Sequence, residues 1–356
     1  MSGGVDSSVA ALLLKQAGYE VVGVTMKLYS VDQAELPAYY RGCCTVDDVE
    51  DARMVCHRLG VPHYVFNVQR EFQTFVIDYF CSEYQRGRTP HPCIACNDKI
   101  KFSFLLQRAR FLDASYVATG HYARIEPREG GLHLLKGVDP QKDQSYVLYG
   151  MRQDQLARTL LPVGWYSKEE IRQMALQAGF PNAQKPDSQD ICFIPSGDYR
   201  KFLREHIAPR PGYVVNTQGN ILGEHEGVEF FTIGQRRGLG IAGQRPLYVV
   251  GIDSEKAQVI VGPEDELYSD TMWALEINYV SGEEPEDPIE ITAKIRYKSP
   301  EVEATLYPQG NDAVIRFHRP QRAVTPGQAV VFYNGDEVLG GGRISGGRPR
   351  AKDNSP

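Results

Sequence analysis

The sequence predicts an α/β fold, a doubly wound parallel sheet, followed by a small β-rich central domain and a C-terminal antiparallel β-barrel. Three observations predict it. A glycine-serine turn at residues 2–8 leads directly into an apolar helical run that ends at Gly18. Strand-like and helix-like stretches then alternate to about residue 150, which is typical of parallel βαβ units. From Tyr213 onward, helical periodicity gives way to short strand-like stretches between Gly and Pro turns.

The length of the chain and breaks in its pattern predict three domains. A chain of 356 residues is too long for one compact core. Proline and glycine interrupt the pattern at residues 209–212, and a charged, proline-containing linker at residues 282–288 lies inside the all-β part. We expect an α/β domain with a helical insert at residues 1–208, a small β-rich central domain at 209–270 and a β-barrel at 271–356.

The individual elements follow from periodicity and capping signals. In the first part we expect strands at residues 20–26, 63–68 and 116–119, and helices at 47–59, 71–86 and 98–111. Ser167 and Glu170 form a capping box that predicts a helix closed by Gly179, and another helix follows at residues 198–206. The strands expected in the all-β part are residues 212–215, 228–232, 247–252, 258–261, 289–297, 301–307, 313–317, 329–333 and 337–344.

The composition is that of a soluble globular protein, with 42% hydrophobic and 24% charged residues. No apolar stretch approaches the roughly 20 residues needed to cross a bilayer, so we expect no membrane partner and a cytoplasmic location. Seven cysteines, an odd number, favour reduced thiols with chemical or metal-binding roles. The net charge of −6 argues against indiscriminate polyanion binding, although a local basic patch would suffice for one nucleic acid.

The turn at the front of the chain has the features of an anion site. Gly3 and Gly4 can bring backbone N–H groups close to an anion, and the turn lies at a helix N-terminus that favours phosphate. It has no lysine of the Walker type, so it suits a leaving pyrophosphate better than a transferred phosphoryl group. Met26 would lie at the carboxyl end of the next strand, where doubly wound sheets bind nucleotides.

This turn resembles the PP-loop of the N-type ATP pyrophosphatases, which activate a carbonyl oxygen with AMP and release pyrophosphate. The resemblance implies ATP and Mg²⁺. In that fold a central strand precedes the loop, whereas only Met1 precedes it in this sequence. We therefore expect an upstream extension of about five apolar, β-branched residues that supplies the strand.

Three cysteines stand in chemically suggestive positions. Cys93 and Cys96 form a Cys-x-x-Cys pair in a loop that we expect to be rigid and to lie between two helices. Such a pair serves either sulfur chemistry with a lowered thiol pKa or two positions of a metal site. A structural zinc would need further ligands, and the adjacent Cys43 and Cys44 are poor candidates. Cys192 lies where a polar loop enters an apolar triplet.

Motifs along the whole chain resemble, in the right order, those of one family, the bacterial tRNA-specific 2-thiouridylases (MnmA), which place sulfur on the wobble uridine of certain tRNAs. Besides the front turn, these motifs are residues 89–92 with Cys96-Asn97, 119–122, 142–146, 190–194, 223–227, 233–240, 324–328 and 332–335.

The resemblance assigns roles position by position. Cys192 matches the cysteine that bears a persulfide and Cys96 the second catalytic cysteine. The residues that match the ATP site are Ser2, Gly3, Gly4, Val5, Asp6, Ser7, Ser8, Met26 and Gly120. The residues that match contacts to the target base or elsewhere on the tRNA are His91, Pro92, Cys93, His121, Lys142, Asp143, Gln144, Arg296, Tyr297 and Gln328. The position of Cys93 is commonly aspartate in the best-known members, so their aspartate-assisted proton transfer is not carried over.

The chemistry implied by the resemblance has two halves. ATP converts the uridine C2 oxygen into a good leaving group, with Mg²⁺ neutralising charge, and a Cys192 persulfide then delivers sulfur. A Cys96–Cys192 disulfide forms and must be reduced before the next round. A cysteine desulfurase, directly or through a relay, is the implied sulfur donor. The number and spacing of the cysteines leave a rival mechanism open, in which Cys93, Cys96 and Cys192 bind a [4Fe–4S] cluster whose fourth iron holds sulfide.

Basic side chains in the β section support a nucleic-acid partner. Lys294, Arg296 and Lys298 occupy every second position and are therefore expected on one face of a strand. Arg236 and Arg237 form a second basic site. Two other functions stay open: a PP-loop enzyme that adenylates a small carboxylate or amide, and a nucleotide sensor without catalysis. The first leaves the three cysteines and the basic β section unexplained.

Overall fold

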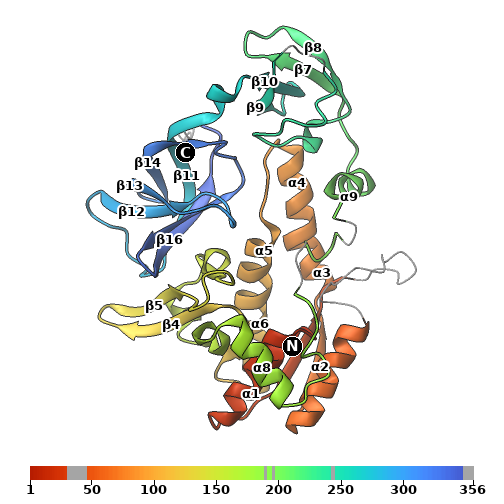
Figure 1. Cartoon of the computed structure of the whole chain (residues 1–356), viewed down its shortest axis with the longest axis vertical. Helices are drawn as coiled ribbons and strands as arrows, with labels where there is room; N and C mark the ends of the chain where they lie inside the picture. Colours follow the sequence, from red (N-terminus) through yellow and green to blue (C-terminus); the bar gives the residue numbers. More distant parts are fainter. Residues whose placement is uncertain (30–45, 188–190, 195–196, 242–244, 348–356) are drawn as a thin grey trace, which may run out of the picture. The chain divides into compact units, whose positions relative to one another are not determined.

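The computed structural model describes residues 1–29, 46–187, 191–194, 197–241 and 245–347 (Figure 1). It divides into two compact units. Unit 1 comprises Met1–Asp78, Pro92–Tyr199 and Asp336–Val338, and unit 2 comprises Tyr79–His91, Arg200–Gly335 and the residues from Leu339 onward. Cys43 and Cys44 lie outside the described residues, as do Ser188, Gln189 and Asp190.

Unit 1 begins with the α/β arrangement that the sequence predicts. Helix α1 (Val5–Gln16) follows the front turn, and β1 (Gly23–Lys27), α2 (Val46–Leu59) and β2 (His63–Asn67) come next. Strands β1 and β2 pair in parallel, as do β3 (Val117–Ala118) and β6 (Thr159–Leu160). Buried residues of α1 and α2 pack with Ile171 and Ala175 into one core. The α/β class is therefore confirmed.

Two long helical stretches of the chain contain π-helical segments. The first consists of α3 (Gln69–Phe72), a π segment at Gln73–Asp78 and α4 (Tyr79–Gln85). The second consists of α5 (Pro92–Ala95), a π segment at Cys96–Phe104, α6 (Leu105–Ala109) and a 3₁₀ turn at Arg110–Leu112.

The expectation of a rigid loop around Cys93 and Cys96 was wrong, because helix begins at Pro92. Proline is favoured at the first helical position, since its fixed φ suits a helix and its missing N–H would have no partner there. Both cysteines are therefore held by helical backbone, and Cys96 begins the π segment.

The remainder of unit 1 includes a β-hairpin that the sequence analysis missed. Strands β4 (Ala123–Arg128) and β5 (Gly131–Lys136) pair antiparallel, and Glu337 pairs with Leu135 of β5. The other elements are 3₁₀ turns at Ser145–Leu148 and Pro162–Trp165, α7 (Gln153–Leu156) and α8 (Lys168–Gln177). The predicted capping box is confirmed: Ser167 is the N-cap of α8, and its backbone N–H donates to Glu170 at 2.7 Å.

Unit 2 contains a four-stranded sheet with the order β8-β7-β10-β9, after helix α9 (Tyr199–His206). Its strands are β7 (Gly212–Asn216), β8 (Ile221–His225), β9 (Tyr248–Asp253) and β10 (Gln258–Gly262). The strand expected at 228–232 is wrong, because Val228–Phe230 forms a 3₁₀ turn. Its residues are all buried, as is Phe231, so the stretch lacks the alternation of a half-buried strand.

The C-terminal strands close into an antiparallel barrel, as predicted, and β11 adds a sixth strand to the five that were expected. Their order is β11-β14-β13-β12-β15-β16, and β16 pairs with β11. They comprise β11 (Tyr268–Tyr279), β12 (Ile289–Lys294), β13 (Val302–Gln309), β14 (Asp312–Arg322), β15 (Ala329–Asn334) and β16 (Glu337–Ile344), preceded by a 3₁₀ turn at Glu264–Leu267. β12 ends at Lys294, so Arg296 and Lys298 do not share a strand face with it and that expectation is corrected. Among the described helices, none has the length and apolar character to cross a membrane.

Candidate active site

The front turn has the geometry of a tight anion loop. Gly3 has φ +70°, and a Cβ there would clash with the backbone of Asp48, so the position requires glycine. Gly4 is the N-cap of α1 and makes no side-chain cap, so the first N–H groups of the helix face the loop. The hydroxyls of Ser7 and Ser8 donate to the Gly4 carbonyl at 3.1 and 2.9 Å.

Gly120 is brought against this loop from a distant part of the sequence. A Cβ on Gly120 would lie 2.7 Å from the backbone of Asp6 and Ser7, so only glycine allows the approach. Met26 is the penultimate residue of β1 at its carboxyl end, as expected. The predicted nucleotide residues at 2–8 and 120 are therefore neighbours in the folded chain.

Asp6 is joined to a lysine that the sequence analysis did not single out. Its Oδ1 accepts hydrogen bonds from the Tyr122 hydroxyl and from Lys168 Nζ, each at 2.7 Å. Burial, together with the Asp6 carboxylate, raises the pKa of Tyr122 far above its usual value, so the phenol stays protonated. The Lys168 side chain is only 11% exposed. The Lys168 ammonium group therefore places a buried positive charge at the N-terminus of α1. The turn at residues 2–8 has no cationic side chain of its own.

Asp187 joins this lysine to two further cations. Lys142 and Lys168 approach its carboxylate at 2.8 Å and Arg172 at 3.0 Å. Burial acts to raise the pKa of Asp187, but the hydrogen bonds from Lys142 and Lys168 outweigh it and lower the pKa. Asp187 is therefore a carboxylate at neutral pH. No local pattern reveals this group, because its members come from separate segments.

The segment before Cys192 is also bound to the front turn and to α2. Asn182 Nδ2 donates to the Gly3 carbonyl at 2.9 Å and contacts Ser8 Oγ at 3.0 Å. Lys185 pairs with Asp48 at 2.6 Å and Asp51 at 2.7 Å. Residues 182–187 are thus held on the front turn and on α2.

The three cysteines differ in exposure. Cys93 is exposed, Cys96 is buried and Cys192 is half-buried. The Tyr29 hydroxyl donates to the Cys192 carbonyl, and the neighbouring Phe193 ring packs edge-on against Phe72 at 5.7 Å. Within the described part of the chain, no group of three or more His, Cys, Asp or Glu side chains is placed to hold a metal ion. Cys93, Cys96 and Cys192 thus do not form a ligand set for the cluster alternative in this arrangement.

His121 is buried and held by polar neighbours. Its Nδ1 lies 2.7 Å from the Thr119 hydroxyl, and its Nε2 lies 3.5 Å from Lys101 Nζ. Burial, with a smaller contribution from Lys101, lowers the pKa of His121 well below its usual value. The imidazole is therefore neutral at physiological pH.

Asp143 and Gln144, expected to touch tRNA, make internal hydrogen bonds. Asp143 accepts from the backbone N–H of Gly137 and of Ser145, each at 3.1 Å. Gln144 Oε1 accepts from the Tyr122 backbone N–H at 3.0 Å. Through these hydrogen bonds, the side chains of Asp143 and Gln144 stabilise the loop that carries Lys142.

Unit 2 gathers the other predicted RNA contacts around residues 89–91. Gln328 Nε2 donates to the Thr89 carbonyl at 2.8 Å, and the rings of His91 and Tyr297 meet edge-on at 6.0 Å. Burial lowers the pKa of His91 to about 4. Arg296 donates to Ala323 O and Thr325 Oγ1 at 2.6 and 2.8 Å. The helix that carries Pro92, Cys93 and Cys96 continues directly from this group in sequence.

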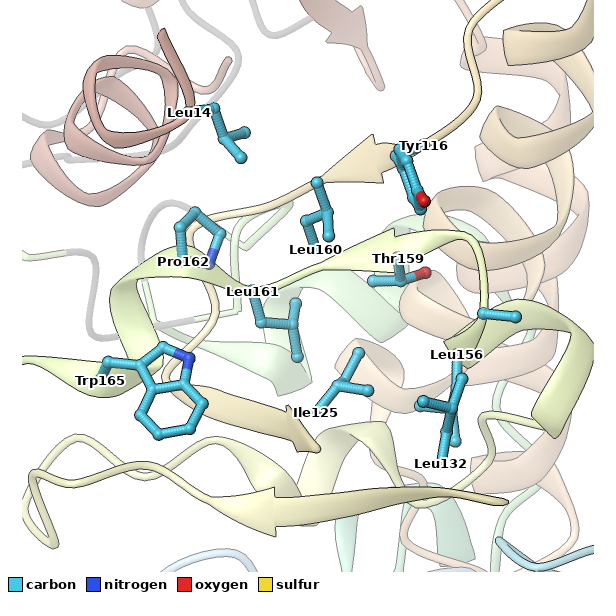
Figure 2. A pocket seen from close by; sticks show the side chains of 11 residues that line it. Leu14, Tyr116, Ile125, Leu132, Leu156, Thr159, Leu160, Leu161, Pro162 and Trp165 are labelled. Carbon is cyan, nitrogen blue, oxygen red and sulfur yellow. The ribbon is translucent and has the colours of Figure 1, made fainter. Parts of the chain in front are cut away.

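Two cavities lie apart from these residues. In unit 1, a cavity of about 310 Å³ is lined by apolar side chains that include Leu14, Leu160 and Trp165, and it contains none of the predicted site residues (Figure 2). In unit 2, a cavity of about 500 Å³ is lined by residues 236, 238–241 and 245–247. Its two cations, Arg236 and Arg245, are both exposed.

Comparisons with known proteins agree along the whole chain. Residues 1–196 match the tRNA methyl transferase HUP domain, residues 200–263 the tRNA methyl transferase PRC-barrel domain, and residues 269–344 the aminomethyltransferase beta-barrel domain.

Full-length relatives carry one name. The tRNA-specific 2-thiouridylase MnmA of Halothermothrix orenii is 51% identical over 348 residues, which are 97% of this chain and 97% of the relative. Proteins of the same name from Symbiobacterium thermophilum and Geobacter metallireducens are 52% and 50% identical, over 97% of this chain and 90% and 95% of their own lengths. The chain therefore belongs to the MnmA family of tRNA-specific 2-thiouridylases.

Proposed function

We propose that the chain catalyses ATP-dependent 2-thiolation of the wobble uridine of tRNA. The observation that carries this is the identity of about half of all residues to curated 2-thiouridylases over 97% of the chain. The geometry supports it, because an anion-binding turn and the segment that leads to Cys192 are joined by hydrogen bonds and ion pairs within one unit.

The first half-reaction activates the uridine. The C2 oxygen attacks the α-phosphate of ATP, AMP becomes attached to that oxygen, and pyrophosphate leaves along the N–H groups of the Gly3-Gly4 turn. Mg²⁺ bound together with ATP would supply positive charge that neutralises the phosphates. Asp6 and Lys168 hold the front of α1 in place. The imidazole of His121, the residue after Gly120, is neutral. It can therefore form hydrogen bonds without adding a positive charge to the site.

The second half-reaction delivers sulfur. The donor leaves a persulfide on Cys192, and the Cys96 thiolate attacks the Cys192 sulfur and releases hydrosulfide. Hydrosulfide adds to C2 and AMP departs, which yields 2-thiouridine and a Cys96–Cys192 disulfide. A thiol reductant then supplies two electrons and restores both thiols. The direct attack of the persulfide on C2 requires the same disulfide step.

The cluster alternative makes a separate prediction. A cluster would need Cys93, Cys96 and Cys192 as ligands, and the described structure does not bring them together as a metal-binding group. The mechanism above takes no step through it. Iron and acid-labile sulfide, measured in protein purified anaerobically, decide between the two readings, because the persulfide route requires neither.

We also propose which domain carries out which part of the reaction. We assign nucleotide and sulfur chemistry to residues 1–208, and tRNA binding to the barrel at 271–356 with the central domain at 209–270 between them in sequence. The family-model ranges support boundaries near these positions, since they change between residues 196 and 200 and between 263 and 269. A cysteine desulfurase, directly or through a relay, is the proposed sulfur donor.

The test is incubation with ATP, Mg²⁺, unmodified tRNA and a sulfur source. We expect AMP and 2-thiouridine in stoichiometric amounts. The variant Cys192→Ser is expected to lose thiolation by at least about a thousandfold, because the serine hydroxyl cannot carry persulfide sulfur, while ATP and tRNA bind as before. Thiolation that survives in this variant would remove Cys192 from its role. If the unaltered chain forms AMP without thiolating tRNA, the result would favour another adenylating enzyme. If it forms neither product, the result would favour a nucleotide sensor.

A further inference from the structure

The side-chain amide of Asn182 holds one carbonyl of the front turn. Its Nδ2 donates to the Gly3 carbonyl at 2.9 Å and to the Ser8 hydroxyl at 3.0 Å. Within the described part of the chain, the Gly3 carbonyl accepts no other hydrogen bond. The Gly4 carbonyl, in contrast, accepts from the hydroxyls of both Ser7 and Ser8. The direction of the Gly3 carbonyl therefore depends on Asn182.

A carbonyl that is fixed in direction also fixes the N–H group of the next residue, because the two groups of a trans peptide point in opposite directions. Asn182 is only 3% exposed and Gly3 is buried, whereas Gly4 is half-buried. The Gly3 carbonyl thus points to the interior, and the Gly4 N–H points away from Asn182. Gly4 is the N-cap of α1, so this N–H lies beside those that a helix N-terminus offers to an anion.

Asn182 is itself held in place by described neighbours. Its carbonyl accepts the Lys185 backbone N–H at 3.0 Å, and Lys185 Nζ pairs with Asp48 at 2.6 Å and with Asp51 at 2.7 Å. Asp48 is also the residue whose backbone a Cβ on Gly3 would meet. The short segment 182–185 is therefore bound both to Gly3 and to the helix that packs against it.

Fold stability alone does not account for an amide at this position. The Oδ1 atom of Asn182 is buried and has no hydrogen-bond partner among the described residues. A buried acceptor without a partner destabilises a fold. What the amide contributes is therefore the two hydrogen bonds that its Nδ2 donates to the turn.

We infer that Asn182 is a positioning residue for the pyrophosphate part of ATP, because it keeps the Gly4 N–H directed at the phosphates. This rests on the proposed function, which places a leaving pyrophosphate on this turn. Without the bond from Asn182, the peptide between Gly3 and Gly4 is free to turn, since glycine permits both hands of backbone. A carbonyl would then face the anion and repel it. Asn182 touches no phosphate in this role and acts only through the Gly3 carbonyl.

The test separates the two ends of the nucleotide. Isothermal titration is performed with inorganic pyrophosphate and Mg²⁺, and separately with adenosine. The variant Asn182→Leu removes both donors at nearly constant volume. We expect its affinity for pyrophosphate to fall at least about tenfold, because an N–H bond to a charged group is lost. Its affinity for adenosine, which has no phosphate, is expected to stay within about twofold.

Gln155→Met is the matched control. Gln155 is a buried amide of the same unit, 7% exposed, and its Nε2 donates to the Phe102 carbonyl at 2.6 Å. We expect this variant to keep both affinities within about twofold. Asn182→Ala is the second variant, because it removes the same donors without placing a branched side chain in the site. Circular dichroism and the thermal unfolding midpoint show whether each variant is folded.

The outcomes distinguish this inference from the proposed function. If pyrophosphate affinity is unchanged in both Asn182 variants, or if adenosine affinity falls equally, Asn182 does not orient the turn and the inference is overturned. An equal loss in Gln155→Met overturns it too, because the loss of any buried amide would then explain the result. If the unaltered chain binds pyrophosphate but makes no 2-thiouridine, the proposed function fails, and the pyrophosphate affinities of the variants still decide the role of Asn182. An unaltered chain that binds no pyrophosphate overturns the inference even if it thiolates tRNA.

Discussion

At the scale of single residues, the front turn depends on glycine at one position for two separate reasons. Gly3 has φ +70°, and a Cβ there would meet the backbone of Asp48. We expect Gly3→Ala to weaken ATP binding at least about tenfold, because the left-handed backbone alone costs an L-residue about 1–2 kcal/mol and the clash displaces the loop. Isothermal titration of ATP with Mg²⁺ measures this.

Gly18 supplies the matched control. It has φ +86°, and a Cβ there would meet nothing within 4 Å. Gly18→Ala therefore carries the same kind of backbone strain without the collision, and it lies at the far end of α1. Equal losses of ATP affinity in both variants would mean that overall destabilisation, and not the shape of the turn, explains the result.

Asp98, two residues after Cys96, is expected to make stability depend on pH. Burial raises its pKa from 3.8 to about 7, and Lys99 and Arg152 oppose that rise only in part. The folded state therefore binds a proton more tightly than the unfolded chain. Stability falls as the pH rises from about 4 to about 7, and the penalty is complete above pH 7.

Asp98→Asn removes that penalty. Denaturant unfolding is expected to show the variant more stable than the unaltered chain by about 1–2 kcal/mol at pH 8, less than the full linkage value because Asp98 is only half-buried. At pH 5 the difference is expected to shrink. A gain that is the same at both pH values would show that the Asp98 carboxyl does not titrate as described.

At the scale of elements, sequence patterns located those whose signals are local. The capping box of Ser167 and Glu170 marked the start of α8, and apolar periodicity marked α2 within one residue. The hairpin β4–β5 was missed, although Gly130 and Gly131, both with positive φ, stand at its turn. Proline at 127 weakens the strand pattern there, which is why the signal was overlooked.

The residues of the site show the same division between local and long-range signals. The glycine-serine turn and the cysteines can be recognised in the sequence, because these residue types seldom occur together at such short spacings. Lys168 and Asp187 do not, because a lysine and an aspartate are ordinary surface residues until the fold brings them together as an ion pair. Long-range ion pairs carry no periodicity, so sequence reasoning had no means to find the connection between the nucleotide loop and the Cys192 segment.

At the scale of the whole molecule, an acidic chain must bind an acidic substrate. The net charge is −6, so affinity for tRNA has to come from local concentrations of positive charge. In unit 2, the 500 Å³ cavity presents Arg236 and Arg245, and neither forms an ion pair with any carboxylate that the structure describes. Arginines that form no ion pair with the described carboxylates and line one cavity are suited to backbone phosphates.

The double variant Arg236→Glu with Arg245→Glu tests that surface. It is expected to weaken tRNA binding at least about tenfold at 0.1 M salt, because two phosphate contacts become repulsive. The slope of log K against log salt is expected to decrease by about 1–2, since each lost contact removes about 0.7–0.9 from it. Filter binding over a range of salt concentrations measures both quantities, and titration with ATP shows that unit 1 is intact.

The control must change the net charge equally, because a more acidic chain repels RNA at any site. Each cation replaced by glutamate changes the charge by −2, so both double variants change it by −4. Lys201 and Lys256 are exposed cations of unit 2 that pair with Glu205 and Asp253, at 3.9 and 3.2 Å. If Lys201→Glu with Lys256→Glu weakens binding as much as the arginine pair does, tRNA responds to total charge. A loss confined to the arginine variant, with the smaller salt slope, assigns the phosphate contacts to the cavity.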